Sequence, residues 1–346
     1  MAVLTAPTTP GKASTPGGIA AWYRNQRGRG ALEVSVLFFA LQLFCVVWFL
    51  SDKVGFNYLS KGNLAVMTQA GSWLAFLAIG EGIVMMVGEI DLSVGANMGM
   101  SSLVFLTWYQ GGNSWFICVL LALLTGVAIG VVNALVINFT KIPSLISTLG
   151  MMSLIWGLSV WYTGGDDIEA PRVKEFGKTF EKLLVGDIGH GVHAQLGWVI
   201  GIGALIWVVI HRHRLGNHIS AVGGNEQAAK AISINPNRVR LKAFALLGVL
   251  AAFGGILISV QTKTLLPGST LDYNLPAVTA AVIGGTAVKG GKGSVLGMIL
   301  GTFIVKTFQA IVLLSSILPG FYLQVFIGGM LILFASVNQY FENKAT

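Results

Sequence analysis

Long apolar runs separated by short polar segments dominate the chain from about residue 34 onwards. A helix needs roughly 20 residues to cross about 30 Å of hydrocarbon, and ten runs approach that length. They are 34–51, 63–87, 92–108, 115–138, 144–163, 194–211, 241–262, 272–288, 294–312 and 320–337. The pattern therefore predicts an all-α integral membrane protein with about ten transmembrane helices.

Two places in this pattern indicate helices that are short or broken within the membrane. The run 272–288 is short, and 63–87 joins 92–108 through a polar, glycine-containing segment. Residues 90–96 also resemble residues 271–277, and the spans that follow these segments are expected to run in opposite directions. We therefore expect two inverted five-helix halves with breaks at matching places.

Polar residues at these breaks are candidates for holding the half-helices at set depths. Asp91 and Asp272 are each expected to cap the helix that follows, because a carboxylate favours the free N–H groups of a helix start. Two charges, Glu81 and Lys306, fall inside spans, where each should meet protein, water or a counter-charge. A mutual ion pair and separate contacts both remain open. The candidate helix-break or gating residues are Glu89, Asp91, Ser93, Gly95 and Asp272.

The amino-acid composition excludes several classes of function. Of 346 residues, 54% are hydrophobic and 10% are charged, and the mean hydropathy is +0.74, whereas soluble domains carry about 25% charged residues. Soluble enzymes and nucleic-acid-binding proteins are therefore excluded, despite a net charge of +8.

Cys45 and Cys118 lie in apolar runs, which favours packing over a disulfide or metal pair. No nucleophile and base are paired, so we expect no catalysis, cofactor or metal.

The basic residues predict the orientation of the chain. With ten spans and an internal N-terminus, fourteen of the 22 Lys and Arg residues fall on the cytoplasmic side, seven fall outside, and Lys306 lies within a span. Both termini are therefore expected in the cytoplasm, with the acidic loop 164–193 outside. We expect a disordered basic tail at 1–33, a single transmembrane domain at 34–337 and a short cytoplasmic tail at 338–346.

The cytoplasmic segment 212–240 contains a short helix with a marked start and stop. Gly223-Gly224 predicts a turn, Asn225 suits the N-cap, and the alanines that follow favour a helix that Asn235-Pro236 would stop. A small helix along the membrane face fits a groove in another protein. The residues alone leave an ordinary loop helix equally open.

Glycines spaced four apart predict close helix packing, because they leave one face of a helix bare. Gly126 and Gly130 form one such ladder in the run 115–138. Gly293, Gly297 and Gly301 form another.

Three motifs follow one another along the chain. The first is Gly88-Glu89-Ile90-Asp91-Leu92-Ser93-Val94-Gly95. The second is Ala221-x-Gly223-Gly224-Asn225-x-x-Ala228-Ala229. The third is Val282-Ile283-Gly284-Gly285-Thr286, with Gly290-Gly291-Lys292-Gly293-Ser294-Val295-Leu296-Gly297. Together, from about residue 58 to 337, the chain resembles the permeases of sugar ABC transporters of the ribose, xylose and galactose type.

The chain departs from that family at three positions. Glu89 stands where glycine is usual, Ser233 where glycine often follows the coupling helix, and Asn217 where a cation is common. These departures concern details of coupling and leave the class unchanged.

The resemblance implies a binding-protein-dependent importer in the bacterial inner membrane. Its implied partners are a cytoplasmic ABC ATPase, an extracytoplasmic substrate-binding protein that docks partly on loop 164–193, and a second permease subunit, expected to be a copy of this chain. Membrane lipid surrounds the pair, and no nucleic acid is involved. The ATPase-coupling residues that it implies are Gly223, Gly224, Asn225, Glu226, Ala228 and Ala229.

The implied activity is import of a monosaccharide-type solute by alternating access, driven by the partner ATPases. Residues 290–294 do not complete a phosphate-binding loop, because Thr286 and Gly293 replace residues that such a loop requires. Nucleosides, branched-chain amino acids or a signalling sugar are alternative solutes, and an ion-coupled secondary carrier is an alternative class. Candidate pathway residues for a polyol are Gln69, Asn97, Asn133, Tyr273, Asn274 and Gln309.

Overall fold

The computed structural model describes residues 29–50, 58–169, 177–314 and 322–345, and these are mostly helical. The helices are α2 (Arg29–Leu50), α3 (Lys61–Val87), α4 (Val94–Gln110), α5 (Trp115–Thr140), α6 (Ser144–Thr163), α7 (Lys178–Val185), α8 (Ala194–Arg212), α9 (Arg214–Gly224), α10 (Glu226–Ala231), α11 (Pro236–Thr262), α12 (Asn274–Ile283), α13 (Val295–Leu314) and α14 (Tyr322–Ala345), with the 3-10 turn η1 (Leu271–Tyr273). The all-α membrane class is confirmed.

Short strands supplement the helices at one end of the molecule. β1 (Ile168–Glu169) pairs antiparallel with β4 (Thr264–Leu265), which ties the loop after α6 to the end of α11. β2 (Asp187–Gly189) and β3 (Val192–His193) form a second antiparallel pair just before α8. These ribbons were not expected from the sequence, because two- and three-residue strands leave no usable periodicity.

Seven helices within the described residues are long and apolar enough to cross a membrane: α3, α5, α6, α8, α11, α13 and α14. α2 contains a shorter apolar stretch, while α4 has 17 residues and α12 has 10. Each of the ten apolar runs coincides with a helix; α2 is 22 residues long, whereas α4 and α12 are shorter than the seven spanning helices. The chain is therefore a multi-pass membrane protein whose count of ten spans stays a prediction.

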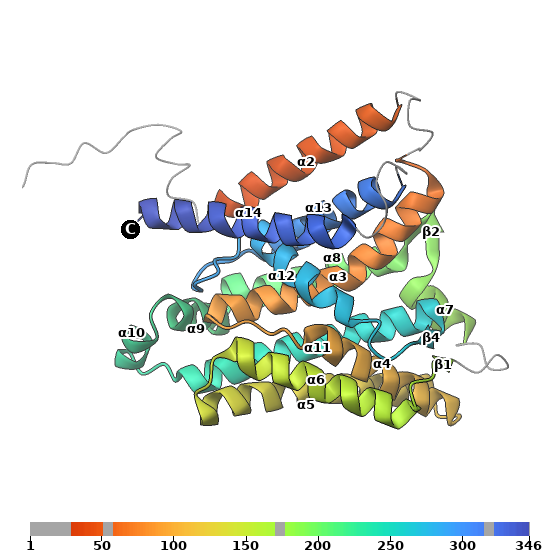
Figure 1. The fold of residues 1–346 in the computed structure, drawn as a ribbon, viewed down its shortest axis with the longest axis horizontal. Helices are drawn as coiled ribbons and strands as arrows, with labels where there is room; N and C mark the ends of the chain where they lie inside the picture. Colours follow the sequence, from red (N-terminus) through yellow and green to blue (C-terminus); the bar gives the residue numbers. More distant parts are fainter. Residues whose placement is uncertain (1–28, 51–57, 170–176, 315–321, 346) are drawn as a thin grey trace, which may run out of the picture.

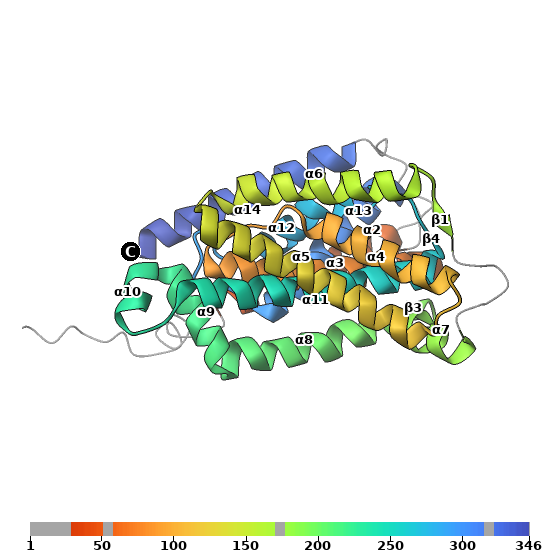
Figure 2. The same ribbon diagram turned by 90° about the horizontal axis from the view of Figure 1, so that it is seen from below.

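The long helices lie alongside one another, and the extramembrane elements gather at opposite ends (Figure 1). α9, α10 and the C-terminal end of α14 lie at one end, whereas α7, β1 and β4 lie at the other (Figures 1 and 2). We call these the α10 end and the β1 end. The segment expected on the cytoplasmic side and the loop expected outside are therefore separated by the length of the helices.

α3 and α11 form the centre of the bundle. Most of α3 is buried, from Gly71 to Val87, and α11 packs against α3, α4 and α5. Both glycine ladders lie at close helix contacts, as predicted, the first against α11 and the second against the end of α12. A Cβ at Gly126 or Gly130 would overlap backbone carbonyls of α11, and one at Gly297 or Gly301 would overlap those of Gly284 and Ala280.

The helix contacts are reciprocal between two parts of the chain. α5 packs on α11 and α13 packs on α3; α4 contacts α5, α6 and α11, while α12 contacts α13, α14 and α3. Exchanging α3–α6 with α11–α14 thus maps this contact pattern onto itself.

Some helix limits differ from those expected. α2 begins at Arg29 and α14 continues to Ala345, so helix replaces part of each expected tail. α12 ends at Ile283 rather than 288, because Gly285 turns the chain with a φ of 79°. Residues 1–28 of the expected tail, residues 170–176 of the acidic loop, and residue 346 lie outside the described residues.

Candidate functional site

The segment expected to couple the chain to a partner forms two helices, α9 and α10. Asn225 is the N-cap of α10 and its Oδ1 accepts a hydrogen bond from the Ala228 amide at 2.9 Å, as predicted. Asn235 caps α11 in the same way, with Pro236 in its first turn. The turn expected at Gly223-Gly224 was wrong: both glycines lie in the last turn of α9. They end a helix because Asn225 adopts extended backbone and starts the next one.

Glycines join this segment to two others at the α10 end. A Cβ at Gly223 would overlap Met86 of α3 and lie 2.6 Å from the amide of Gly291. The Gly291 amide donates to the Met86 carbonyl at 2.9 Å. A Cβ at Gly290 would lie 3.0 Å from Gly88. The three motifs therefore meet in one cluster, defined here as the glycine cluster: Gly88, Gly223, Gly290 and Gly291.

Backbone packs directly on backbone in the glycine cluster. Gly88 ends α3 with a φ of 95°, and Gly290 and Gly291 have φ values of 94° and 82°. These left-handed conformations favour glycine because it lacks a Cβ. With no side chains between them, α9, the end of α3 and the turn after α12 are held too closely to move far independently.

The face of α10 directed away from the bundle is small and mixed in character. Gln227, Ala228 and Lys230 are exposed, Ala229 is buried against the protein, and Ile232 just beyond the helix is 69% exposed. α10 lies at the tip of the α10 end in both views (Figures 1 and 2). This face is accessible to a partner.

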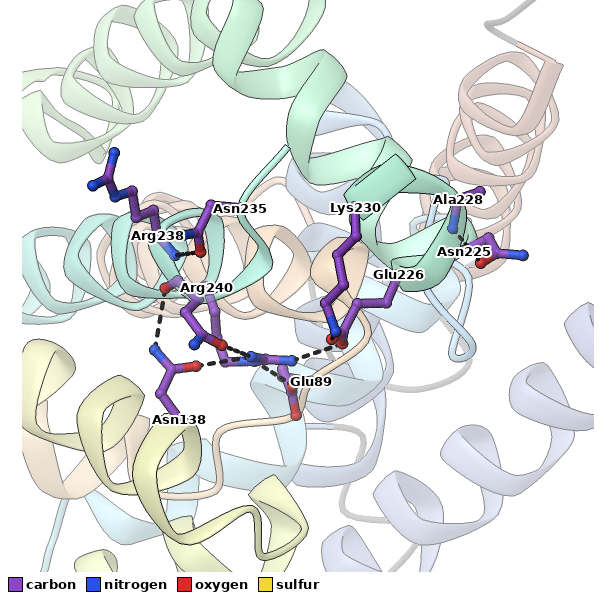
Figure 3. Close-up of polar contacts among 10 residues, drawn as sticks. Glu89, Asn138, Asn225, Glu226, Ala228, Lys230, Asn235, Arg238 and Arg240 are labelled. Carbon is purple, nitrogen blue, oxygen red and sulfur yellow. Dashed lines mark hydrogen bonds and ion pairs between the residues drawn. The ribbon is translucent and has the colours of Figure 1, made fainter. Parts of the chain in front are cut away.

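A buried arginine lies behind α10 (Figure 3). Arg240 of α11 is 8% exposed, and its Nε lies 2.5 Å from Oε1 of Glu89. Its Nη1 donates to Oδ1 of Asn138 at 2.8 Å, and its Nη2 lies 3.3 Å from Oε2 of Glu226. Glu89, one of the candidate gating residues, therefore pairs with this chain's own arginine. Arg240 itself was missed, because its charge fitted the general excess of cations on that side.

Glu226 has a second partner in its own helix. Its Oε1 lies 2.7 Å from Nζ of Lys230, four residues later. The pKa of Glu226 is lowered from its usual value of 4.5, chiefly by the hydrogen bond from Lys230, with a further contribution from the nearby Arg240 charge. At neutral pH Glu226 is therefore an anion shared between two cations.

The helix break between α3 and α4 is built around Asp91, which is fully buried. Its Oδ1 accepts from the amide and hydroxyl of Ser93 at 2.7 and 2.6 Å, and its Oδ2 accepts from Asn133 at 3.1 Å. Glu81 Oε1 accepts from the Asp91 amide at 3.0 Å. Asp91 thus folds the segment before α4 rather than capping α4, whose N-cap is Ser93.

The second break is arranged differently. Asp272 is exposed and lies in η1, and no side chain of the described residues caps the start of α12. The expected cap was therefore wrong. Instead, Asn274 Oδ1 accepts from the amide of Gly95 in the first turn of α4 at 2.6 Å. A residue of the second break therefore caps the helix that follows the first break. The similarity between residues 90–96 and 271–277 did not reveal this contact.

Within the described residues, the polar residues proposed for a pathway make contacts in separate places. Gln69 contacts His193 near β3 at 2.8 Å, and Asn97 donates to the Gly126 carbonyl at 3.1 Å. Asn133 belongs to the Asp91 network, and Gln309 is half-buried in α13. Their role in a pathway stays a prediction. One described pocket lies between α4, α6 and the loop before η1, lined by Ala96, Gly99, Leu103, Trp156, Ser159, Gly268 and Thr270.

The two charges inside spans lie apart. Among the described residues no ion pair joins Glu81 to Lys306. Lys306 Nζ lies 5.3 Å from the ring centroid of Tyr273, a cation–π geometry. Glu81 faces the Asp91 network, where its Oε2 finds no hydrogen-bond partner within the described parts of the chain.

Comparison with known proteins identifies the family. A family model described as branched-chain amino acid transport system / permease component matches residues 63–335. The ribose import permease protein RbsC of Escherichia coli K12 is 32% identical over 279 residues, which cover 79% of this chain and 83% of that protein. No solved structure matches the chain.

Two further relatives are similar. The autoinducer 2 import system permease protein LsrC of Salmonella typhi is 30% identical over 294 residues, 85% of this chain and 82% of that protein. The ribose import permease protein RbsC of Haemophilus influenzae is 28% identical over 284 residues, 81% of this chain and 85% of that protein. The chain therefore belongs to this family of permease components and is a membrane-spanning subunit of an ABC importer, not an enzyme.

Proposed function

We propose that the chain translocates a monosaccharide-type solute, delivered by an extracytoplasmic binding protein and driven by two cytoplasmic ATPases. The observation that carries this proposal is the glycine cluster. It joins the exposed helix α10, through α9, to the ends of the two helix pairs that contain breaks. A partner that moves α9 and α10 therefore acts directly on α3 and on the turn between α12 and α13.

The identity of the solute is supported by the relatives. Two of the compared permeases import ribose and one imports autoinducer 2, whereas the family description names branched-chain amino acids. A sugar is therefore the first candidate, and a signalling sugar, a nucleoside or an amino acid remains an alternative.

The finer architecture that we propose is two inverted halves within ten spans, with both termini cytoplasmic. The reciprocal contacts of α3–α6 and α11–α14 support the two halves. The short helices α4 and α12, whose starts meet at Gly95 and Asn274, support breaks at matching places. Two copies of the chain would complete the translocation pore.

The β1 end is the proposed docking surface for the binding protein. Asp166, Asp167 and Glu169 are exposed there, whereas Glu181 and Asp187 pair with Lys263 and Lys61 at 3.2 and 3.4 Å. The paired acids hold the loop to the bundle, and the exposed acids present negative charge to a partner.

The function is tested by measuring ATP hydrolysis in lipid-reconstituted complexes assembled from this chain and the ATPase that co-purifies with it. Binding proteins loaded with ribose, other monosaccharides, nucleosides or branched-chain amino acids are compared. We expect stimulation of hydrolysis by one sugar-loaded binding protein, together with uptake of that sugar. Uptake driven by an ion gradient, without any ATPase, would instead establish the secondary-carrier alternative.

The coupling surface is tested by placing charge on the exposed side of α10. The double variant Ala228→Glu with Ile232→Glu should reduce co-purification of the ATPase at least tenfold, because the added carboxylates would be buried in the interface without partners. Ile188→Glu is the matched control, since Ile188 is 68% exposed at the β1 end. Equal ATPase recovery for the double variant and the control would contradict the proposed surface.

A further inference from the structure

Arg240 connects four segments that meet behind α10. Its guanidinium contacts Glu89 after α3, Asn138 near the end of α5, Glu226 at the start of α10, and Asn237 in its own helix. Figure 3 shows the guanidinium with Glu89 and Glu226 on one side and Asn138 on the other. A single side chain thus joins the segment that faces the partner to the segment that leads into the α3–α4 break.

The two carboxylates differ in how firmly they hold the arginine. The side chains of Arg240 and Glu89 are 10% and 14% exposed and lie 2.5 Å apart, whereas the Glu226 side chain is 42% exposed and lies 3.3 Å away. Exposed ion pairs contribute little and break readily, while breaking a buried pair leaves an uncompensated charge. Arg240 should therefore stay with Glu89, a contact that we call the fixed end. It should separate more easily from Glu226, a contact that we call the releasable end.

Glu226 also has an alternative partner within reach. Lys230 holds its other oxygen at 2.7 Å and belongs to the same helix. A movement of α10 away from α11 would separate Glu226 from Arg240 but keep it with Lys230. Releasing the contact therefore does not leave Glu226 unpaired.

We infer that Arg240 is a positioning residue that latches α10 to the α3–α4 break, and that the latch between Arg240 and Glu226 opens and closes as the partner ATPases move α10. The inference rests on the proposed function, because it needs α10 to be the moving element. Glu89 precedes Asp91 by two residues, so a displacement passed through Arg240 reaches the network that sets the break. Direct coupling of this kind requires a two-state contact, which the shared carboxylate provides.

The latch also gives a role to the departure at Glu89. A glycine at position 89 would offer no side chain to the arginine, and the break would then be joined to α10 through the glycine cluster alone. In this chain, Glu89 supplies a second connection between the same two segments.

The latch is tested in the reconstituted complex by measuring solute transported per ATP hydrolysed, stimulated by the loaded binding protein. Glu226→Gln removes the releasable contact and leaves the buried pair intact, so the variant should fold. Glu89→Gln removes the fixed end. Each should lower the transport-to-hydrolysis ratio at least about fivefold.

Arg238→Gln is the control for a change of charge beside the latch, because it removes an exposed cation two residues from Arg240. Arg238 is exposed and points away from Arg240, Glu89 and Glu226 in Figure 3. The transport-to-hydrolysis ratio of this variant should therefore match that of the unmodified chain. The double variant Glu89→Gln with Glu226→Gln should be no worse than the more affected single variant, because both changes disable one latch.

Four results separate the possibilities. Wild-type ratios in Glu226→Gln and Glu89→Gln, with ATPase still bound and the unmodified complex active, would overturn the latch and keep the proposed function. Multiplying effects in the double variant would also overturn it, since the residues would act independently. A lowered thermal midpoint with an unchanged ratio would assign Arg240 a purely structural role. Absence of any ATPase stimulation in the unmodified complex would reject the proposed function itself.

Discussion

Ser233 follows α10 with a φ of 64°, in the left-handed region where a Cβ is crowded. The resembling permeases often have glycine at this point, and the backbone conformation gives the physical reason. Sequence comparison identified the departure, but only the structure shows that serine retains the conformation which glycine adopts without strain. The turn from α10 towards α11 therefore contains backbone strain, which lowers the stability of the folded chain.

Replacing Ser233 should alter stability in opposite directions according to the new side chain. Ser233→Gly is expected to stabilise the turn by about 0.5 kcal/mol, because the strain removed exceeds the entropy that glycine adds to the unfolded chain. Ser233→Val should destabilise it, because a β-branched residue suits this region least. Thermal unfolding of the purified protein, with hydrogen exchange over α10, measures both. Equal midpoints for the two variants would contradict this account.

Single polar residues at the breaks show what a sequence motif can and cannot assign. Asp91 and Asp272 occupy matching places in two similar segments, yet Asp91 is fully buried and Asp272 is exposed. Asn274 was selected as a pathway residue, but its side chain caps α4 from another helix. The type of residue needed at a break was predictable. The partner of each residue was not, because it comes from a segment far away in the chain.

At the scale of helices, small residues decide how closely elements approach. Gly130 of α5 lies against the carbonyl of Phe244 in α11, and Gly248 of α11 lies against that of Gly126. The four-residue spacing predicted these contacts correctly, because a bare stripe serves close packing whichever helix provides the other side. The identity of the facing helix came only from the structure.

Adding one methyl group tests this packing. Gly130→Ala should destabilise the protein by about 1–3 kcal/mol, because the new Cβ would overlap backbone that cannot withdraw as a side chain could. Gly150→Ala in α6 is the matched control: no atom lies within 4 Å of the place that its new methyl group would occupy, and alanine favours a helix. Unfolding midpoints in detergent compare the two. If Gly150→Ala lowered the unfolding midpoint more than Gly130→Ala, the close contact between α5 and α11 would not be what restricts the residue at position 130.

Element boundaries were predictable where a local signal fixes them. Asn225 caps α10 as predicted, by chemistry that acts within three residues. Asn235-Pro236 was predicted to stop that helix, but α10 already ends at Ala231, and Asn235 and Pro236 begin α11 instead. Gly223-Gly224 suggested a turn, because two adjacent glycines usually interrupt a helix. They remain helical here, since Gly223 packs tightly against α3 and the turn after α12. Tertiary packing overrode the local preference.

At the scale of the whole molecule, the arrangement of the two ends follows the distribution of charge. α9, α10 and the end of α14 share one end, and the acidic loop lies at the other (Figure 1). The excess of basic residues predicts that the α10 end faces the cytoplasm.

Cysteine labelling in intact cells tests this orientation. Cys45 and Cys118 are buried, so the unmodified chain should react weakly with a membrane-impermeant thiol reagent and serves as the control. Asp167→Cys should be labelled from outside, whereas Gln227→Cys should be labelled only after the membrane is opened, because both positions are exposed but at opposite ends. Labelling of Gln227→Cys in intact cells would reverse the topology.

The sequence by itself determined the membrane class, the approximate helices, the family and the residue types at the breaks, because hydropathy, capping and glycine spacing act over short distances along the chain. Only the tertiary structure decided that three separated motifs meet in the glycine cluster, that Asn274 caps α4, and that Arg240 joins Glu89 to Glu226. These contacts join residues up to about 200 positions apart, and their geometry depends on how whole helices pack, which no local pattern encodes.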